Sequence, residues 1–128
     1  MMKYRRLGHT GLIVSEVALG SMQFGDKMNM GNLGQEDTTR MVSLALDNGI
    51  NFIDTADVYS LGESETLLGN ALKGIREEIV LATKARLPMS ENVNRSGATR
   101  VNILREVEGS LQRLQTRLHR SVPGARMG

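Results

Sequence analysis

The sequence predicts an α/β fold built on a parallel β-sheet. Short apolar runs alternate with stretches of helical periodicity, glycines close the first two helical stretches, and charged side chains follow the apolar runs. Strands that alternate with helices form parallel sheets with right-handed crossover connections. Charged groups directly after buried strands suit such folds, because parallel α/β proteins place their chemistry at the carboxyl ends of their strands.

The N-terminal segment predicts a hairpin that leads into the first core strand. Residues 4–7 and 12–17 flank the turn Gly-His-Thr-Gly, which has the glycines that a tight turn requires. Residues 17–19 form a short apolar run, so we expect a buried strand there. Residues 26–34 are rich in glycine, asparagine and aspartate, which predicts a loop.

Three amphipathic stretches predict helices, over residues 35–48, 63–74 and 102–115. Apolar side chains recur in each at intervals of three or four residues, and Gly49 and Gly74 close the first two as C-caps. The apolar stripe of the third helix consists of Ile103, Val107, Leu111 and Leu114. Between the helices, residues 51–56 and 79–83 predict two buried strands.

Composition places the chain among globular proteins. Its 128 residues are enough for one domain with a core, and 40% are hydrophobic and 23% charged. The absence of cysteine excludes disulfides and thiolate metal sites, and it suits the reducing cytoplasm. The N-terminus lacks the apolar core of a secretory signal, and no run is long enough to cross a bilayer. We therefore expect a cytoplasmic protein without membrane insertion.

The charge distribution argues against a nucleic-acid surface. The formal net charge is +2, but Arg117, Arg120 and Arg126 all follow the last acidic residue. Residues 1–116 therefore carry a net charge of −1, with a short basic tail behind them. Aromatic residues make up only 3% of the chain, so stacking platforms for single strands are lacking as well.

Asp54, Tyr59 and Lys84 form a candidate acid–base site at the ends of two predicted strands. A tyrosine has a pKa of about 10 and gives up its proton reluctantly at neutral pH. A neighbouring lysine ammonium favours the phenolate, and an aspartate can keep that ammonium charged and oriented. Such a set could protonate a carbonyl oxygen while a cofactor delivers hydride. Spacing alone somewhat favours the alternative in which Asp54 caps a loop, Lys84 is a solvated strand end and Tyr59 packs at a rim.

The motifs LGSMQFG, NFIDTADVY, GESETLLGNAL and IVLATK together resemble the aldo/keto reductase family, including its bacterial members. The resemblance covers residues 3–116 and not residues 117–128. It implies the N-terminal part of a (β/α)8 TIM barrel, with the hairpin and about three βα units, and hence an incomplete barrel. It also implies NADPH as cofactor, which agrees with the absence of a G-x-G-x-x-G fingerprint or P-loop.

The resemblance implies a role for each site residue. Tyr59 would be the general acid, Lys84 would promote its ionisation, and Asp54 would pair with Lys84. Ser21 and Met22, after the first strand, match positions that border the nicotinamide and its ribose, and Asp54 also lies next to the cofactor. The substrate would be an aldehyde or ketone. The family's fourth catalytic residue, a histidine that ends the fourth strand, has no counterpart before residue 117.

Residues 117–128 predict an aberrant tail. With suitable codons, removal of one base after Thr116 turns this tail into an apolar strand that ends in a histidine at the position of Ala125. The alternative is a basic tail in its own right. We expect a truncated chain of weak or no activity, which self-associates through an exposed sheet edge. The alternative function is a non-catalytic subunit, either resembling a potassium-channel β-subunit or docking to a separate C-terminal half.

Overall fold

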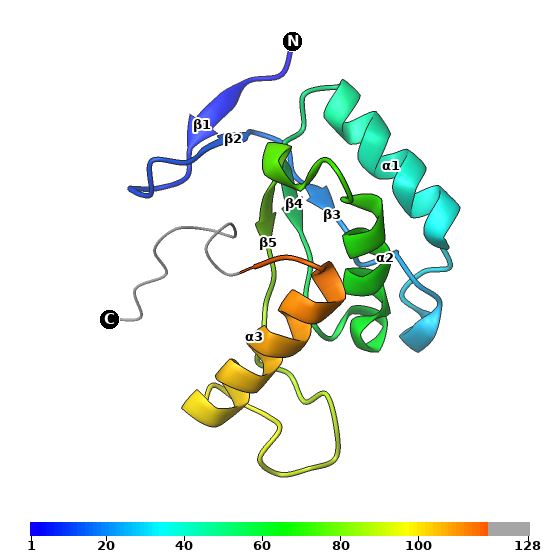
Figure 1. Ribbon diagram of the computed structural model, residues 1–128, viewed down its shortest axis with the longest axis vertical. Coiled ribbons are helices and arrows are strands. Elements are labelled where there is room, and N and C mark those ends of the chain that lie inside the picture. Colours follow the sequence, from blue (N-terminus) through cyan, green and yellow to red (C-terminus); the bar gives the residue numbers. More distant parts are fainter. Residues whose placement is uncertain (118–128) are drawn as a thin grey trace.

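The N-terminal hairpin forms as the sequence predicts. In the computed structural model, which describes residues 1–117, strands β1 (Tyr4–Arg6) and β2 (Ile13–Ser15) pair antiparallel, with Arg5 opposite Val14. Figure 1 shows this hairpin at one end of the molecule, next to the sheet. The predictions for residues 118–128, including the frame-shifted strand, lie outside the described residues.

Three parallel strands form the central sheet, which confirms the predicted fold class. They are β3 (Leu19–Gly20), β4 (Phe52–Asp54) and β5 (Val80–Ala82), in the spatial order β3-β4-β5. In register, Asp54 lies opposite Gly20 on one side and Ala82 on the other. The described part of the chain is thus an open α/β sheet and not a closed barrel.

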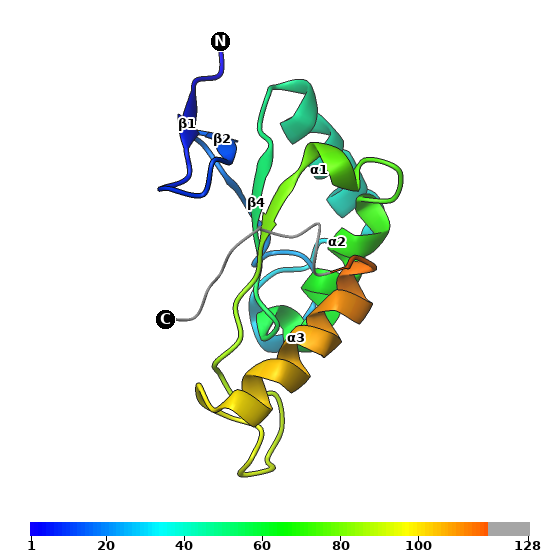
Figure 2. The ribbon, with the colours of Figure 1, turned by 60° about the vertical axis from the view of Figure 1, so that its left-hand side comes forward.

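Three helices cover one face of this sheet. They are α1 (Gln35–Asp47), α2 (Glu63–Ala71) and α3 (Arg100–Leu114), and Figure 2 shows all of them on the same side of the strands. Short 3₁₀ turns supplement them at η1 (Lys27–Asn29), η2 (Tyr59–Gly62) and η3 (Arg76–Glu78). None of the helices within residues 1–117 is long and apolar enough to span a membrane.

An aliphatic core fills the space between the sheet and the helices. Ile53 of β4 is fully buried there with Val42, Leu68 and Phe24. Because side chains alternate along a strand, Phe52 and Asp54 point to the opposite face of the sheet, which the helices leave uncovered. The sequence therefore places Asp54 on an accessible face.

Helix α3 packs closely on α2 at a glycine. A Cβ atom at Gly69 would lie 2.4 Å from the carbonyl oxygen of Arg113 and 2.8 Å from the Cα atom of Leu114, so only glycine fits there. The contact buries a different side of α3 from the predicted apolar stripe. Of that stripe only Leu114 is buried, whereas its other members are half-buried. The residues of α3 that are buried with Leu114 are polar: Asn102, Glu106 and Ser110.

Candidate active site

The carboxyl ends of β4 and β5 bring the three predicted site residues together. Asp54 is the last residue of β4, and Lys84 follows β5 by two residues. Tyr59 begins the η2 turn, which returns the chain from β4 toward α2. Because β4 and β5 are parallel, with Asp54 opposite Ala82, Lys84 lies two residues farther along at the same edge of the sheet.

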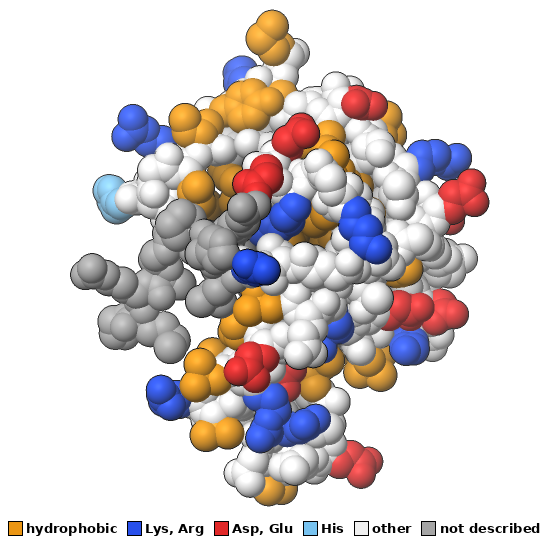
Figure 3. Space-filling view, viewed as in Figure 1, with side chains coloured by type: hydrophobic (Ala, Val, Ile, Leu, Met, Phe, Trp, Pro, Cys, Tyr) orange, Lys and Arg blue, Asp and Glu red, His pale blue; other side chains and the backbone are white. Residues whose placement is uncertain are grey.

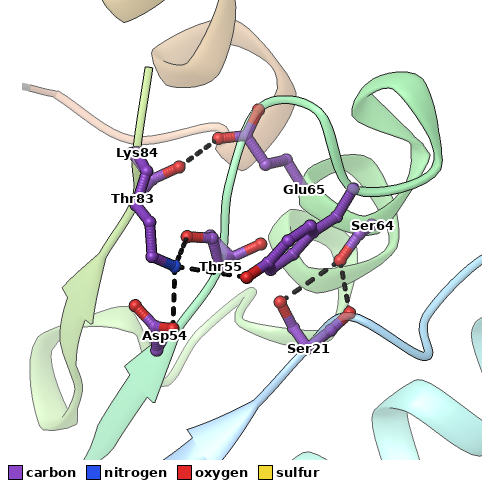
Figure 4. A network of polar contacts seen from close by, with 8 residues as sticks. Ser21, Asp54, Thr55, Ser64, Glu65, Thr83 and Lys84 are labelled. Carbon is purple, nitrogen blue, oxygen red and sulfur yellow. Dashed lines mark hydrogen bonds and ion pairs between the residues drawn. The ribbon is translucent and has the colours of Figure 1, made fainter. Parts of the chain in front are cut away.

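Lys84 is the centre of the site. Its Nζ atom donates to Asp54 Oδ2 at 2.8 Å, to the Thr55 carbonyl oxygen at 2.9 Å and to the Tyr59 hydroxyl at 3.4 Å (Figure 4). The ammonium also lies 5.1 Å from the centroid of the Tyr59 ring. One cation therefore contacts both the carboxylate and the phenol, which is the arrangement that the sequence suggested.

The environment of Lys84 keeps it protonated. Partial burial acts to lower its pKa, but the hydrogen bonds to Asp54 and Tyr59 and the negative charge of Asp54 outweigh this effect and raise the pKa above the ordinary value. The lysine side chain is 53% exposed and the Asp54 side chain 41% exposed, so the pair is open to solvent and to a ligand. A permanent, accessible positive charge next to a phenol is the result.

Ser21 and Met22 take different positions at the end of β3. Ser21 is fully buried, and its backbone N–H donates to the Asp54 carbonyl oxygen at 3.1 Å. The Ser64 hydroxyl donates to the Ser21 carbonyl oxygen at 2.7 Å and lies 3.2 Å from the Ser21 hydroxyl (Figure 4). Met22 is 42% exposed and thus accessible. Contact of either residue with a cofactor stays a prediction.

Sequence reasoning missed a buried ion pair behind the site. Glu65, in the first turn of α2, is completely buried and accepts from Arg113 Nε of α3 at 2.7 Å. The same carboxylate accepts from the Thr83 hydroxyl at 2.6 Å. An acidic residue in a first helical turn usually faces solvent and complements the helix dipole. Nothing in the sequence marks Glu65 as buried, because its cationic partner is 48 residues away.

Asp57 lies between Asp54 and Tyr59 in the sequence, but its side chain makes no hydrogen bond to either of them among the described residues. It is 1% exposed, and its Oδ2 atom has no hydrogen-bond partner among the described residues. Burial, followed by repulsion from Glu106, raises the pKa of Asp57 from 3.8 to about 6, against the opposing hydrogen bond from the Val58 backbone. The structure thus holds this carboxyl group where its ionised form is disfavoured.

We expect Asp57 to make the fold more stable in mild acid than at neutral pH. Because its pKa is higher in the folded than in the unfolded chain, its contribution is complete below pH 3.8 and disappears as pH rises through about 6. The difference amounts to at most about 3 kcal/mol. Asp57→Asn should raise the free energy of unfolding at pH 7 and flatten its change between pH 4 and 7, as measured by urea denaturation. Asp26 is exposed, so the control Asp26→Asn should leave the pH dependence of the free energy of unfolding as in the parent. If Asp57→Asn also leaves it unchanged, the raised pKa of Asp57 is contradicted.

The described strands and helices form an open α/β sheet that brings an aspartate, a lysine and a tyrosine into contact at its carboxyl edge. The chain belongs to the aldo/keto reductase family, which it matches over residues 16–119. It is 39% identical over 117 residues to the aldo-keto reductase YhdN of Bacillus subtilis, covering 90% of this chain and 35% of that protein. It is also 37% identical over 136 residues to the versiconal hemiacetal acetate reductase of Aspergillus parasiticus, and the match covers 90% of this chain and 40% of that protein.

Solved structures agree with the sequence relatives. The holo form of the aldo-keto reductase AKR11C1 from Bacillus halodurans superimposes with a TM-score of 0.74 at 37% identity, covering 91% of this chain and 37% of that one. The three strands and helices described above therefore correspond to part of a TIM barrel. The chain spans little more than a third of the length of these relatives.

Proposed function

We propose that this chain carries the proton-donating part of a site that reduces aldehydes or ketones to alcohols with NADPH. The observation that carries the proposal is the simultaneous contact of Lys84 Nζ with Asp54 and with the Tyr59 hydroxyl. The family's oxidoreductase relatives support the reaction class. The reverse oxidation uses the same groups, because the general acid of one direction is the general base of the other.

Tyr59 would act as the general acid. Its hydroxyl donates a proton to the carbonyl oxygen while the carbonyl carbon receives hydride, so the product is a neutral alcohol. The Lys84 ammonium stabilises the phenolate that remains, and Asp54 holds Lys84 charged and in place. The phenolate then recovers a proton from solvent. The partly exposed Lys84 and Asp54 side chains give that proton a short path.

The residues at this edge fit a nicotinamide cofactor. A reduced nicotinamide would supply the hydride there. Met22, Asp54 and Lys84 have accessible side chains at this edge, and a Cβ atom at Gly20 would meet nothing within 4 Å. The space above Gly20 is therefore open on the side where β3 ends.

The complete activity requires more of the barrel than residues 1–117 provide. Strand β5 has a single neighbour in the described sheet, and apolar side chains of α3 remain half-buried. Hydrophobic side chains also reach the surface beside α3 and the hairpin (Figure 3). We infer that further barrel strands cover this edge and complete the cofactor site. The chain alone should bind NADPH weakly and turn over little, and its open edge favours self-association.

The test is to complete the barrel. Residues 1–116 are fused to the part of the Bacillus subtilis relative YhdN that follows its matched segment, and carbonyl-dependent oxidation of NADPH is measured on aldehydes and ketones. The fusion should turn over, whereas the fusion with Lys84→Met should retain the fold but lose most of the rate. Equal rates for the two fusions would refute the proposal.

Supplying the YhdN part as a separate polypeptide examines the alternative that this chain is an assembly module. The open edge of β5 is the observation that favours this alternative. Activity that appears only on mixing would assign the chain as one half of a two-chain reductase. A stable complex without NADPH oxidation would instead assign a non-catalytic subunit.

A further inference from the structure

Glu65 connects the site to the helix layer. Its buried carboxylate has two partners, and both come from elements other than its own helix: Thr83 after β5 and Arg113 in the last turn of α3. A carboxylate without solvent access is tolerated only when its charge is paired and its lone pairs are satisfied. Glu65 therefore fixes the distance between the end of β5 and α3.

Thr83 and Lys84 project to opposite sides of the extended chain. Figure 4 shows the Thr83 side chain directed toward Glu65 and the Lys84 side chain directed toward Asp54. Consecutive side chains alternate in this way in extended backbone. Holding the Thr83 hydroxyl at 2.6 Å from Glu65 Oε1 thus fixes the rotation that aims the next residue at Asp54 and Tyr59.

Two backbone hydrogen bonds tie the chain around Lys84 to the segment that follows β4. The Lys84 carbonyl oxygen accepts from the Asp57 N–H at 3.1 Å, and the Ala82 carbonyl oxygen accepts from the Thr55 N–H at 2.8 Å. These two hydrogen bonds fix the position of residues 82–84 along the strand direction. The hydroxyl of Thr83, which is itself an exposed residue, adds the contact on the helix side.

Arg113 packs on the η2 turn, which contains Tyr59, and from there its guanidinium reaches Glu65. A Cβ atom at Gly62 would lie 2.8 Å from Arg113 Cδ, so the arginine stem rests directly on the backbone of the η2 turn. The close contact of Gly69 with Arg113 and Leu114 keeps this end of α3 in place. The guanidinium is therefore held against Glu65 by packing as well as by charge.

We propose that Arg113, Glu65 and Thr83 form a positioning relay through which α3 holds Lys84 in register with Asp54 and Tyr59. None of the three touches the reacting atoms. The inference rests on the proposed function, since it assigns these residues a purpose within that site.

Lys84 itself reports on the relay in the full chain. The sequence contains only four lysines, so the ε-methylene NMR signals are few, and Lys84→Met identifies the signal of Lys84. Thr83→Val removes the hydroxyl while keeping the branched shape, and Thr83→Ser keeps the hydroxyl. We expect Thr83→Val to move the titration midpoint of Lys84 to lower pH, toward that of a free lysine, and Thr83→Ser to retain the parent midpoint.

The outcomes separate positioning from stability. A parent-like midpoint in Thr83→Val, with or without a lower free energy of unfolding, would overturn the relay, and so would an equal shift in Thr83→Ser. Asp54→Asn, titrated in parallel, tests the proposed function instead. It should lower the titration midpoint of Lys84 irrespective of the results for the Thr83 variants. If it does not, the Asp54–Lys84 pair fails, and that failure is distinguishable from failure of the relay.

Discussion

Tyr59→Phe should lower carbonyl-dependent NADPH oxidation of the completed barrel by about 10²- to 10⁴-fold, the range that a positioned general acid contributes. The substitution removes one oxygen, which accepts a hydrogen bond from Lys84 Nζ at 3.4 Å. The ring stays half-buried in the η2 turn, so the fold should survive. The loss should fall on the chemical step, and kcat should therefore drop at nearly constant KM.

Tyr4→Phe is the matched control, because the chain contains only two tyrosines. The Tyr4 hydroxyl, in β1 of the hairpin, donates to the Gly49 carbonyl oxygen at 2.8 Å and takes no part in the hydrogen bonds that join Asp54, Tyr59 and Lys84. This variant should keep the full rate. A loss of turnover in Tyr4→Phe as large as in Tyr59→Phe, or none in Tyr59→Phe, would exclude the proton-donor role.

The fold could be predicted because each element carries a local signal. Helical periodicity and closing glycines located α1 and α2 within a few residues, and the strand–helix alternation implied the parallel order β3-β4-β5. Strands β4 and β5 are shorter than predicted, because an apolar run does not mark the extent of the hydrogen-bonded ladder. Residues 51–56, for example, pair as strand only over Phe52–Asp54. The prediction of a buried strand over residues 17–19 was wrong in its position, since β3 begins at Leu19 and Val17 is 52% exposed.

The buried side of α3 could not be predicted in the same way. Periodicity favoured the stripe that begins at Ile103, but the Gly69 contact turns Asn102 and Glu106 inward. Which side of a helix is buried depends on its partner, and the partner here is a glycine in another helix. Hydrophobic pattern alone favoured a stripe that is half-buried in the structure except at Leu114.

The site was predictable where chemistry and strand ends coincide. Asp54 directly follows one apolar run and Lys84 lies one residue beyond another, and a parallel sheet brings such positions to one edge. The ion pair between Glu65 and Arg113 could not be predicted, because in sequence both residues occupy helix positions that are typical of solvent-exposed side chains. Only the tertiary structure reveals that the two meet in the interior.

Arg113→Met should cost about 3 kcal/mol of the free energy of unfolding at pH 7, because it leaves the fully buried Glu65 carboxylate without its counter-charge. Water reaches a quarter of the Arg113 side chain, which places the cost at the lower end for a broken buried pair. The exposed Arg105→Met, in the same helix, should change the free energy by less than about 0.5 kcal/mol. Urea denaturation of both variants measures the difference.

A double substitution separates the charge from the packing. Glu65→Gln removes the negative charge but keeps an amide oxygen that can accept from the Thr83 hydroxyl. Combined with Arg113→Met, it should recover most of the loss, because an uncharged partner no longer demands a cation in the interior. If the double variant is as unstable as the sum of its two parts, the cost of Arg113→Met lies in the stem that packs on Gly62, and the ion pair contributes little. If the double variant instead regains most of the free energy of unfolding, the main contribution of Arg113 is to neutralise the buried Glu65 carboxylate, which accepts from the Thr83 hydroxyl.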